Sequence, residues 1–221
     1  MKTKAILAST LVTLGVLSSC VKHEIIPAPV PKVDLTCHFE GVVSGTDIEF
    51  TQNVSGYFLE TDKSKLVVPG SPSEAIYYSE MKSGEMLQAI KINLGTVYWD
   101  AMVAADPTLA LFNGFMSAQV STPPVYTIGG KDGFEVSYRD ASGIIWLTKD
   151  NDPGDVVTFA NVVQESDATG DYSKFVASFE CTVYHTFMTV IQGPTPAQND
   201  TTYDEQSFLI KDAVFKGWFK R

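Results

Sequence analysis

Carboxylate side chains offer this chain its widest choice of chemistry. Two carboxylates can cleave a glycosidic bond, one as an acid and the other as a base or nucleophile. Glu40, Asp100 and Glu180 are the nominal candidates for such a pair. The three histidines show no His-x-x-x-His spacing, and the chain has no Gly-x-Ser-x-Gly elbow for nucleophilic catalysis. Because most acidic residues are simply solvated, the sequence leaves an enzyme uncertain and leans towards none, with no cofactor.

Two cysteine segments could supply metal ligands or a disulfide. Cys37-His38 and Cys181-x-x-x-His185 together offer two thiols and two imidazoles, and zinc needs four such ligands converging on one point. Neighbouring residues on a strand point to opposite faces, so we expect no metal site. Cys37 and Cys181 both fall on the apolar side of their strands and should be buried. They either form a disulfide, which requires Cα atoms within about 7 Å, or remain thiols.

The densest run of oxygen ligands is Asp150-Asn-Asp-Pro-Gly-Asp155. Calcium favours such loops, but the glycine is misplaced for an EF-hand loop. Asp-Pro-Gly-Asp is itself a favourable type II turn. The turn is therefore the preferred interpretation.

The fourth kind of chemistry is acylation of a thiol near the start of the chain. Lys2 and Lys4 precede an uncharged, largely apolar run that ends in Leu17-Ser-Ser-Cys20. This is the arrangement of a secretory signal, and the run is too short to span about 30 Å of hydrocarbon comfortably. The last four residues resemble the lipobox of bacterial lipoproteins, in which the cysteine is acylated and becomes the first residue. An ordinary signal with a chance cysteine is the alternative.

These observations predict three segments: a signal peptide over residues 1–19, a lipidated Pro-rich tether over 20–32 and a single domain over 33–221. Loss of Lys2 and Lys4 changes the formal net charge from −10 to about −12. An acidic chain without a basic run cannot neutralise phosphates, which argues against nucleic acid. It also argues against adhesion to anionic lipid by charge, so acyl chains must hold the protein to the membrane.

The elements of the domain are mostly short strands. Alternating apolar residues mark about ten of them, separated by Gly, Pro and Asp turns. Asp106-Pro107 predicts the start of one short helix, which Pro123-Pro124 must end. Asp140-Ala-Ser-Gly143 predicts a bulged hairpin that sets Tyr138 opposite Trp146. The sequence thus predicts an antiparallel β-sandwich with one short embedded helix.

The tryptophans of two strands should differ in burial. Trp146 shares a face with apolar residues and belongs in the core. Trp218 lies between Lys216 and Lys220, on the opposite parity from Phe215 and Phe219. That parity places Trp218 on the outer face of the last strand. It is either a platform on which a sugar ring could stack or a ring covered by a neighbouring loop.

Three segments carry a resemblance. They are Phe134-Glu-Val-Ser-Tyr-Arg-Asp-Ala-Ser-Gly143 with Trp146-Leu-Thr148, Phe179-Glu-Cys-Thr-Val-Tyr184, and Ile210-Lys-Asp-Ala-Val-Phe-Lys-Gly-Trp-Phe219. The chain resembles small uncharacterised β-sandwich lipoproteins of the Bacteroidota over its last 90 residues or so. The resemblance implies an envelope location and adds no mechanism.

Taken together, the sequence predicts a lipid-anchored protein of the bacterial cell envelope, held at the outer membrane through palmitate-type acyl chains on Cys20. It would face either the periplasm or the cell surface. The favoured function is a non-catalytic module that binds a polysaccharide or another envelope component. A structural or assembly protein without a small ligand is the alternative, followed by an envelope hydrolase.

The anchor gives a direct test. Cys20→Ala removes the thiol that would be acylated, so the protein should move from the membrane pellet to the soluble envelope fraction. Fractionation followed by immunoblotting measures the distribution. A variant that still sediments with the membrane and resists high-salt extraction would contradict the anchor.

Overall fold

A computed structural model describes residues 32–192 and 200–221, which belong to one compact unit from Lys32 to Arg221. Ten β-strands, one α-helix and a 3-10 turn make up the described part of the chain. Their bounds are β1 His38–Val43, β2 Thr46–Thr51, β3 Tyr57–Leu66, β4 Ser73–Ser83, β5 Ala89–Trp99, α2 Leu109–Ser121, η1 Ile128–Gly130, β6 Phe134–Arg139, β7 Ile145–Leu147, β8 Val156–Asp167, β9 Gly170–Ile191 and β10 Asp200–Lys220. The signal peptide and almost all of the predicted tether lie outside the described residues.

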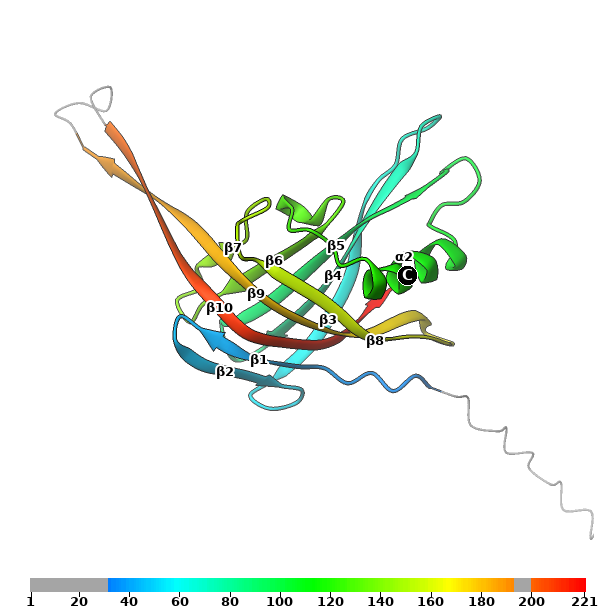
Figure 1. Ribbon diagram of the computed structural model, residues 1–221, viewed down its shortest axis with the longest axis horizontal. Helices are drawn as coiled ribbons and strands as arrows, with labels where there is room; N and C mark the ends of the chain where they lie inside the picture. Colours follow the sequence, from blue (N-terminus) through cyan, green and yellow to red (C-terminus); the bar gives the residue numbers. More distant parts are fainter. Residues whose placement is uncertain (1–31, 193–199) are drawn as a thin grey trace, which may run out of the picture. The chain divides into compact units, whose positions relative to one another are not determined.

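The strands form one curled antiparallel sheet (Figure 1). Their order is β2-β1-β10-β9-β7-β6-β5-β4-β3, and β8 also pairs with β9. The prediction of a mostly β domain with one helix is confirmed, whereas the second sheet of a sandwich is not found among the described residues. The sheet curls on itself instead, so that its own inner face provides both sides of the core.

Strands β9 and β10 are the longest elements, with 22 and 21 residues. Their ladder runs from Tyr172 opposite Lys220 to Ile191 opposite Asp200. β1 pairs with β10 only as far as Ile210, and β7 pairs with β9 at Tyr184. The far halves of β9 and β10 therefore project beyond the sheet as a two-stranded arm (Figure 1).

The inner face of the curled sheet is filled with aromatic side chains. The alternation that points one side of a strand inward is plainest in β4, where buried and half-buried residues alternate strictly from Ser73 to Met81. Phe175 lies at the centre of one group, with ring centroids 4.6 Å from Phe219 and 6.0 Å from Phe215. Burial of these rings supplies most of the driving force for folding.

The curl brings the edge strand β3 close to the end of β10. The backbone N–H of Lys220 donates to the Thr61 hydroxyl at 3.3 Å. A Cβ at Gly217 would lie 2.8 Å from Leu59 Cδ1, so the absence of a side chain allows this approach. The edge strand β3 thus meets the end of β10 without forming a ladder with it, and the sheet resembles half of a barrel.

Turn chemistry sets the β6–β7 hairpin as predicted. Asp140 O accepts the Gly143 N–H at 3.0 Å, and Gly143 has a φ of +85°. Tyr138 lies opposite Trp146. Trp146 is buried as expected, and its indole N–H donates to Asp140 Oδ2 at 2.9 Å.

The helix α2 covers one end of the curled sheet (Figure 1). Phe112 and Met116 are buried, and the Phe112 ring lies 5.1 Å from that of Tyr77. The cap differs from the prediction, because Thr108 rather than Asp106 accepts the N–H of Leu111. Asp106 instead pairs with lysines of β3, so a tertiary contact overrides the local capping signal.

Trp146→Ala should lower the free energy of unfolding by about 3–5 kcal/mol, as is usual for a buried aromatic residue. The substitution removes contacts with the rings of Phe208 and Phe187, at 4.7 and 6.0 Å, and leaves a cavity. Urea unfolding followed by circular dichroism measures the change. Tyr203→Ala is the matched control, because that aromatic side chain is 70% exposed. Equal losses for both variants would contradict the assignment of Trp146 to the core.

Candidate functional site

The three carboxylates proposed for glycosidase chemistry do not meet. Glu40 and Glu180 line two separate hollows on either side of Asp212 in β10. Asp100 lines a third hollow, beyond the end of β5. Since acid and base must flank the same bond, these residues do not form a two-carboxylate site.

The cysteines are also apart. Cys37 and Cys181 are both buried, as expected, and both are free thiols. Cys181 lies opposite Ile210, whereas the residue after Cys37 lies opposite Lys216. Six positions along β10 separate the two sites, which is roughly 15 Å or more at the rise of a strand. The disulfide considered from the sequence is therefore not formed.

The two histidines of the described residues, His38 and His185, make local contacts of their own. His38 Nδ1 lies 3.3 Å from the Thr51 hydroxyl, and His185 Nδ1 lies 2.9 Å from the carbonyl oxygen of Ile145. Within residues 32–192 and 200–221, no group of three or more His, Cys, Asp or Glu could hold a metal ion.

The acidic loop over 150–155 is a docked turn. Asp155 N–H donates to Asp152 O at 3.2 Å with Gly154 at a φ of +95°, as a type II turn requires. Asp150 Oδ1 accepts the Ile128 N–H at 2.6 Å. Asp152 accepts the Tyr184 hydroxyl, a bond that raises the pKa of Tyr184 to about 12. Asp150, Asp152 and Asp155 thus each bind a different protein donor, and together they do not form a metal-binding group.

Asp155 is the most perturbed carboxyl of this loop. Its Oδ1 accepts the Thr182 N–H at 2.9 Å, while its Oδ2 is buried without a hydrogen-bond partner. Burial is the main cause that raises the pKa of Asp155 from 3.8 to about 6, and the charge of Asp152 adds to it. Tyr126, whose pKa burial also raises, lies nearby and shares its hydroxyl hydrogen between two carbonyl oxygens.

Trp218 lies on the outer face of β10, as its parity predicted, but it does not offer an exposed ring on which a sugar could stack. It is only 8% exposed. The segment from Lys32 to Leu35 and the β3 residues Phe58 and Leu59 line a hollow of about 510 Å³ around it. The ring of Trp218 is thus covered by segments far away in sequence, which agrees with the covered-ring alternative and not with an exposed platform for a sugar.

An exposed aromatic ring occurs instead at the end of β5. Tyr98 is 44% exposed, and its hydroxyl donates to the Asp132 carboxylate, with oxygen separations of 2.8 and 3.0 Å. This hydrogen bond raises the pKa of Tyr98 and fixes the ring. A hollow of about 480 Å³ adjoins it, lined by Gly70, Ser71, Pro72, Tyr98, Trp99, Asp100 and Met102.

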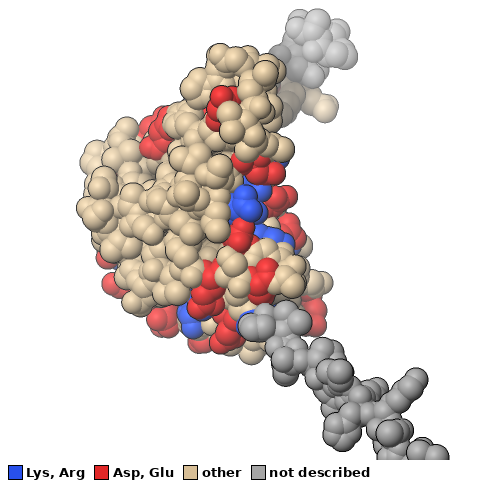
Figure 2. All heavy atoms as spheres, turned by 90° about the vertical axis from the view of Figure 1, so that its right-hand side faces the viewer, with Lys and Arg blue, Asp and Glu red and all other residues tan. Residues whose placement is uncertain are grey.

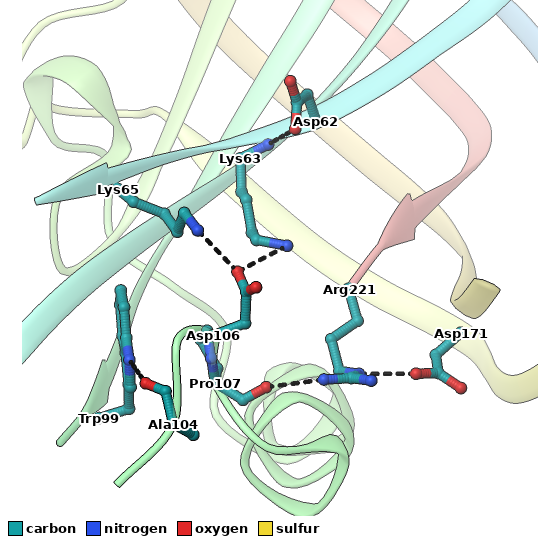
Figure 3. Close-up of polar contacts among 9 residues, drawn as sticks. All are labelled: Asp62, Lys63, Lys65, Trp99, Ala104, Asp106, Pro107, Asp171 and Arg221. Atoms are coloured by element: carbon teal, nitrogen blue, oxygen red, sulfur yellow. Dashed lines mark hydrogen bonds and ion pairs between the residues drawn. The ribbon is translucent and has the colours of Figure 1, made fainter. Parts of the chain in front are cut away.

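The loop after β5 forms the other wall of this hollow. Trp99 is buried, and its indole N–H donates to Ala104 O at 2.9 Å (Figure 3). Asp100 Oδ1 accepts the Met102 N–H at 2.8 Å, which shapes the turn. The loop is thereby held from both ends, and the hollow has fixed walls.

A polar network holds the end of the same loop, at Asp106 and Pro107 (Figure 3). Lys65 and Lys63 approach Asp106 Oδ1 at 2.9 and 3.2 Å, and their hydrogen bonds lower the pKa of Asp106 below 3.8. Arg221 donates to Asp171 Oδ2 at 2.6 Å and to Pro107 O at 3.1 Å. The start of α2 is therefore tied to both β3 and the C-terminal residue.

Sequence reasoning named Asp100 but missed Tyr98 and Trp99. Their alternation within Thr96–Trp99 resembles that of any strand, so nothing marked Tyr98 as exposed. Two signals near this hollow could be read from the sequence: the Pro69-Gly70 turn and the helix-start sequence Asp106-Pro107. Both mark places where a strand or helix begins.

Comparison with known protein families, with curated proteins and with solved structures found no match to this chain. The helix α2, the one α-helix of the described residues, lacks the length and hydropathy needed to cross a membrane. The candidate site is therefore defined by its own geometry.

Asp155 predicts a pH dependence of stability. The folded protein favours the protonated carboxyl, because the pKa rises from 3.8 to about 6 on folding. The contribution of the Asp155 carboxyl to the free energy of unfolding is fully present below about pH 4. It is lost as the pH rises from about 4 to about 6 and does not return at higher pH. Asp155→Asn should therefore gain stability relative to the native protein over this window. Since the carboxyl is partly solvated, we expect about 1–2 kcal/mol at pH 7.5.

Urea unfolding at pH 4 and pH 7.5 measures this gain. Asp150→Asn is the control, because the Asp150 carboxylate lies at an exposed position. A difference between Asp155→Asn and the native protein that stays constant from pH 4 to 7.5 would contradict the prediction.

Proposed function

We propose that this protein is a lipid-anchored module of the bacterial cell envelope that binds a glycan without transforming it. Acyl chains on Cys20 would hold it to the outer membrane, as in the Bacteroidota lipoproteins that the chain resembles. The observation that carries the glycan assignment is the hollow beside Tyr98.

The walls of this hollow suit the two surfaces of a sugar ring. A sugar ring has an apolar C–H face and a rim of hydroxyl groups, and ligand sites combine apolar walls with a few placed polar groups. Tyr98 offers a half-exposed ring that is already immobilised by Asp132, so little side-chain entropy is lost on binding. Ser71 and Asp100 lie at the same hollow and can bind hydroxyls.

We assign no hydrolysis to this hollow, because the neighbouring Asp132 carboxylate is already bonded to the Tyr98 hydroxyl. Asp100 is the sole acidic residue among the described residues that line the hollow. Glycoside hydrolysis commonly needs a second carboxylate across the scissile bond. One carboxylate and an aromatic ring can hold a sugar but do not supply both acid and base.

A structural or assembly role is the second candidate, and the arm of β9 and β10 favours it. Met188, Val190 and Tyr203 are exposed there, and Tyr203 lies directly opposite Met188. A two-stranded ribbon alone is only marginally stable in water. Contact of this apolar face with another envelope protein would stabilise the arm.

Tyr98→Ala should abolish binding to envelope polysaccharide while changing stability little, because the ring is half-exposed. Isothermal titration calorimetry with fractionated polysaccharide measures binding, and urea unfolding measures stability. Tyr98→Phe should retain part of the affinity, since it keeps the ring but loses the bond to Asp132.

Phe58→Ala is the matched control, because Phe58 is an exposed aromatic residue at the separate hollow beside Trp218. Full binding by Tyr98→Ala would exclude the Tyr98 hollow. Loss of binding by Phe58→Ala alone would move the site to the hollow beside Trp218.

A further inference from the structure

Residues 101–130 form a part of the chain that is nearly free of charge. Charged residues make up 19% of the whole sequence, yet this stretch contains only Asp106. Asp106 is turned towards Lys63 and Lys65, which neutralise it. Figure 2, which views the molecule from the side where α2 lies, shows a broad surface without Lys, Arg, Asp or Glu.

This surface exposes apolar side chains. In the loop before α2, Met102 and Val103 are 76% and 79% exposed. On α2 itself, Leu109, Leu111 and Val120 are exposed, and the helix has no charged residue along its 13 positions. A surface helix normally carries charged residues on its solvent side. We call the surface of Met102, Val103 and α2 the uncharged face, and its composition indicates that something covers it.

The uncharged face lies at the end of the domain where the N-terminal segment begins. The Val33 N–H donates to Asp167 Oδ2 at 2.8 Å, beside the turn between β8 and β9. Past that turn, Asp171 binds Arg221, which in turn binds Pro107 O ahead of α2. These contacts connect the first described residues to the segment before the helix through the β8–β9 turn and Arg221.

The length of chain before this point limits how far the domain can lie from its anchor. Lys32 is twelve peptide units from Cys20, which corresponds to at most about 40 Å when fully extended. A domain on so short a connection meets the membrane surface at a high effective concentration. Weak apolar contacts are then sufficient to hold one face against the lipid.

The distribution of charge determines which face of the domain contacts the lipid. The chain carries a net charge of −10, and anionic lipid surfaces repel acidic protein surfaces. The uncharged face approaches lipid without this repulsion, and its exposed Met102 and Val103 gain from burial among acyl chains and headgroups.

We infer that the uncharged face rests on the membrane, with Met102, Val103, Leu109 and Leu111 at the lipid boundary. This inference depends on the lipid anchor in the proposed function. Met102 also lines the hollow beside Tyr98, so the same contact would place that hollow next to the lipid boundary. The contact gives the domain a fixed orientation on the membrane.

Fluorescence quenching by lipid tests the contact. The chain from Cys20 onward is coupled through the Cys20 thiol to a maleimide phospholipid in vesicles that contain brominated phosphatidylcholine and phosphatidylglycerol. Cys37 and Cys181 do not compete, because both are buried and burial raises the pKa of Cys37 to about 11. Coupling makes the result independent of natural acylation, which Cys20→Ala tests separately.

Met102→Trp places a reporter on the uncharged face, and Tyr203→Trp places one on the exposed arm. We expect bromolipid to reduce the fluorescence of Met102→Trp and to leave that of Tyr203→Trp unchanged. Adding Val103→Asp to Met102→Trp should restore the fluorescence, because a carboxylate at the lipid boundary is unfavourable.

Two results would overturn the inference. The first is equal fluorescence of Met102→Trp with brominated and ordinary lipid. The second is an emission change of Met102→Trp that depends on protein concentration in the absence of vesicles, which would assign the uncharged face to a second copy of the chain.

Discussion

The antiparallel pairing of β9 with β10 is the interaction on which the rest of the structure depends. β10 carries β1 on its other edge, while β9 carries both β8 and β7 on its own. The ladder is interrupted once, between Ile210 and Ala213, where Asp212 takes a φ of +49°. Such a bulge increases local bending and twist. The central pair therefore joins both halves of the sheet and also helps to curl it.

The curl determines where binding surfaces can form. β5 pairs with β6 only up to Leu94 but continues with β4 as far as Trp99. The last residues of β5 thus reach the rim of the sheet, where Tyr98 and Asp100 border a hollow. Aromatic rings fill the inner face, whereas hollows occur at the rim beside Tyr98 and along β10 beside Asp212 and Trp218.

Sequence signals correctly predicted the features that neighbouring residues determine, such as turns. Asp140 and Gly143 fixed a turn, and that turn fixed the pairing of Tyr138 with Trp146. The same reasoning gave the parity of Trp218 and offered a covered ring as one alternative. It could not identify the covering residues, because Lys32–Leu35 and Phe58 come from distant parts of the chain. The sandwich prediction failed for a related reason. Strand patterns show which residues point inward, but they do not show whether the opposite wall is a second sheet or the same sheet curled round.

The position of Tyr98 was equally beyond reach from sequence. Its exposure depends on β6 ending its pairing at Leu94, and its fixed orientation depends on Asp132, thirty-four residues further along. Asp155 is a second residue whose burial could not be predicted from the local sequence. Its place in a turn was readable, but the burial of its Oδ2 comes from the packing of β8 and β9 around it.

The place of β10 in the sheet governs the order in which the domain can fold. β10 is the last strand of the chain, yet it lies between β1, the first strand, and β9. Without residues 200–220, β1 and β2 pair with each other but with no other described strand of the sheet. Contacts of such long sequence separation form late and slowly. The sheet therefore closes only when the segment over 200–220 has joined β1 to β9, which makes this long-range pairing a late step in folding.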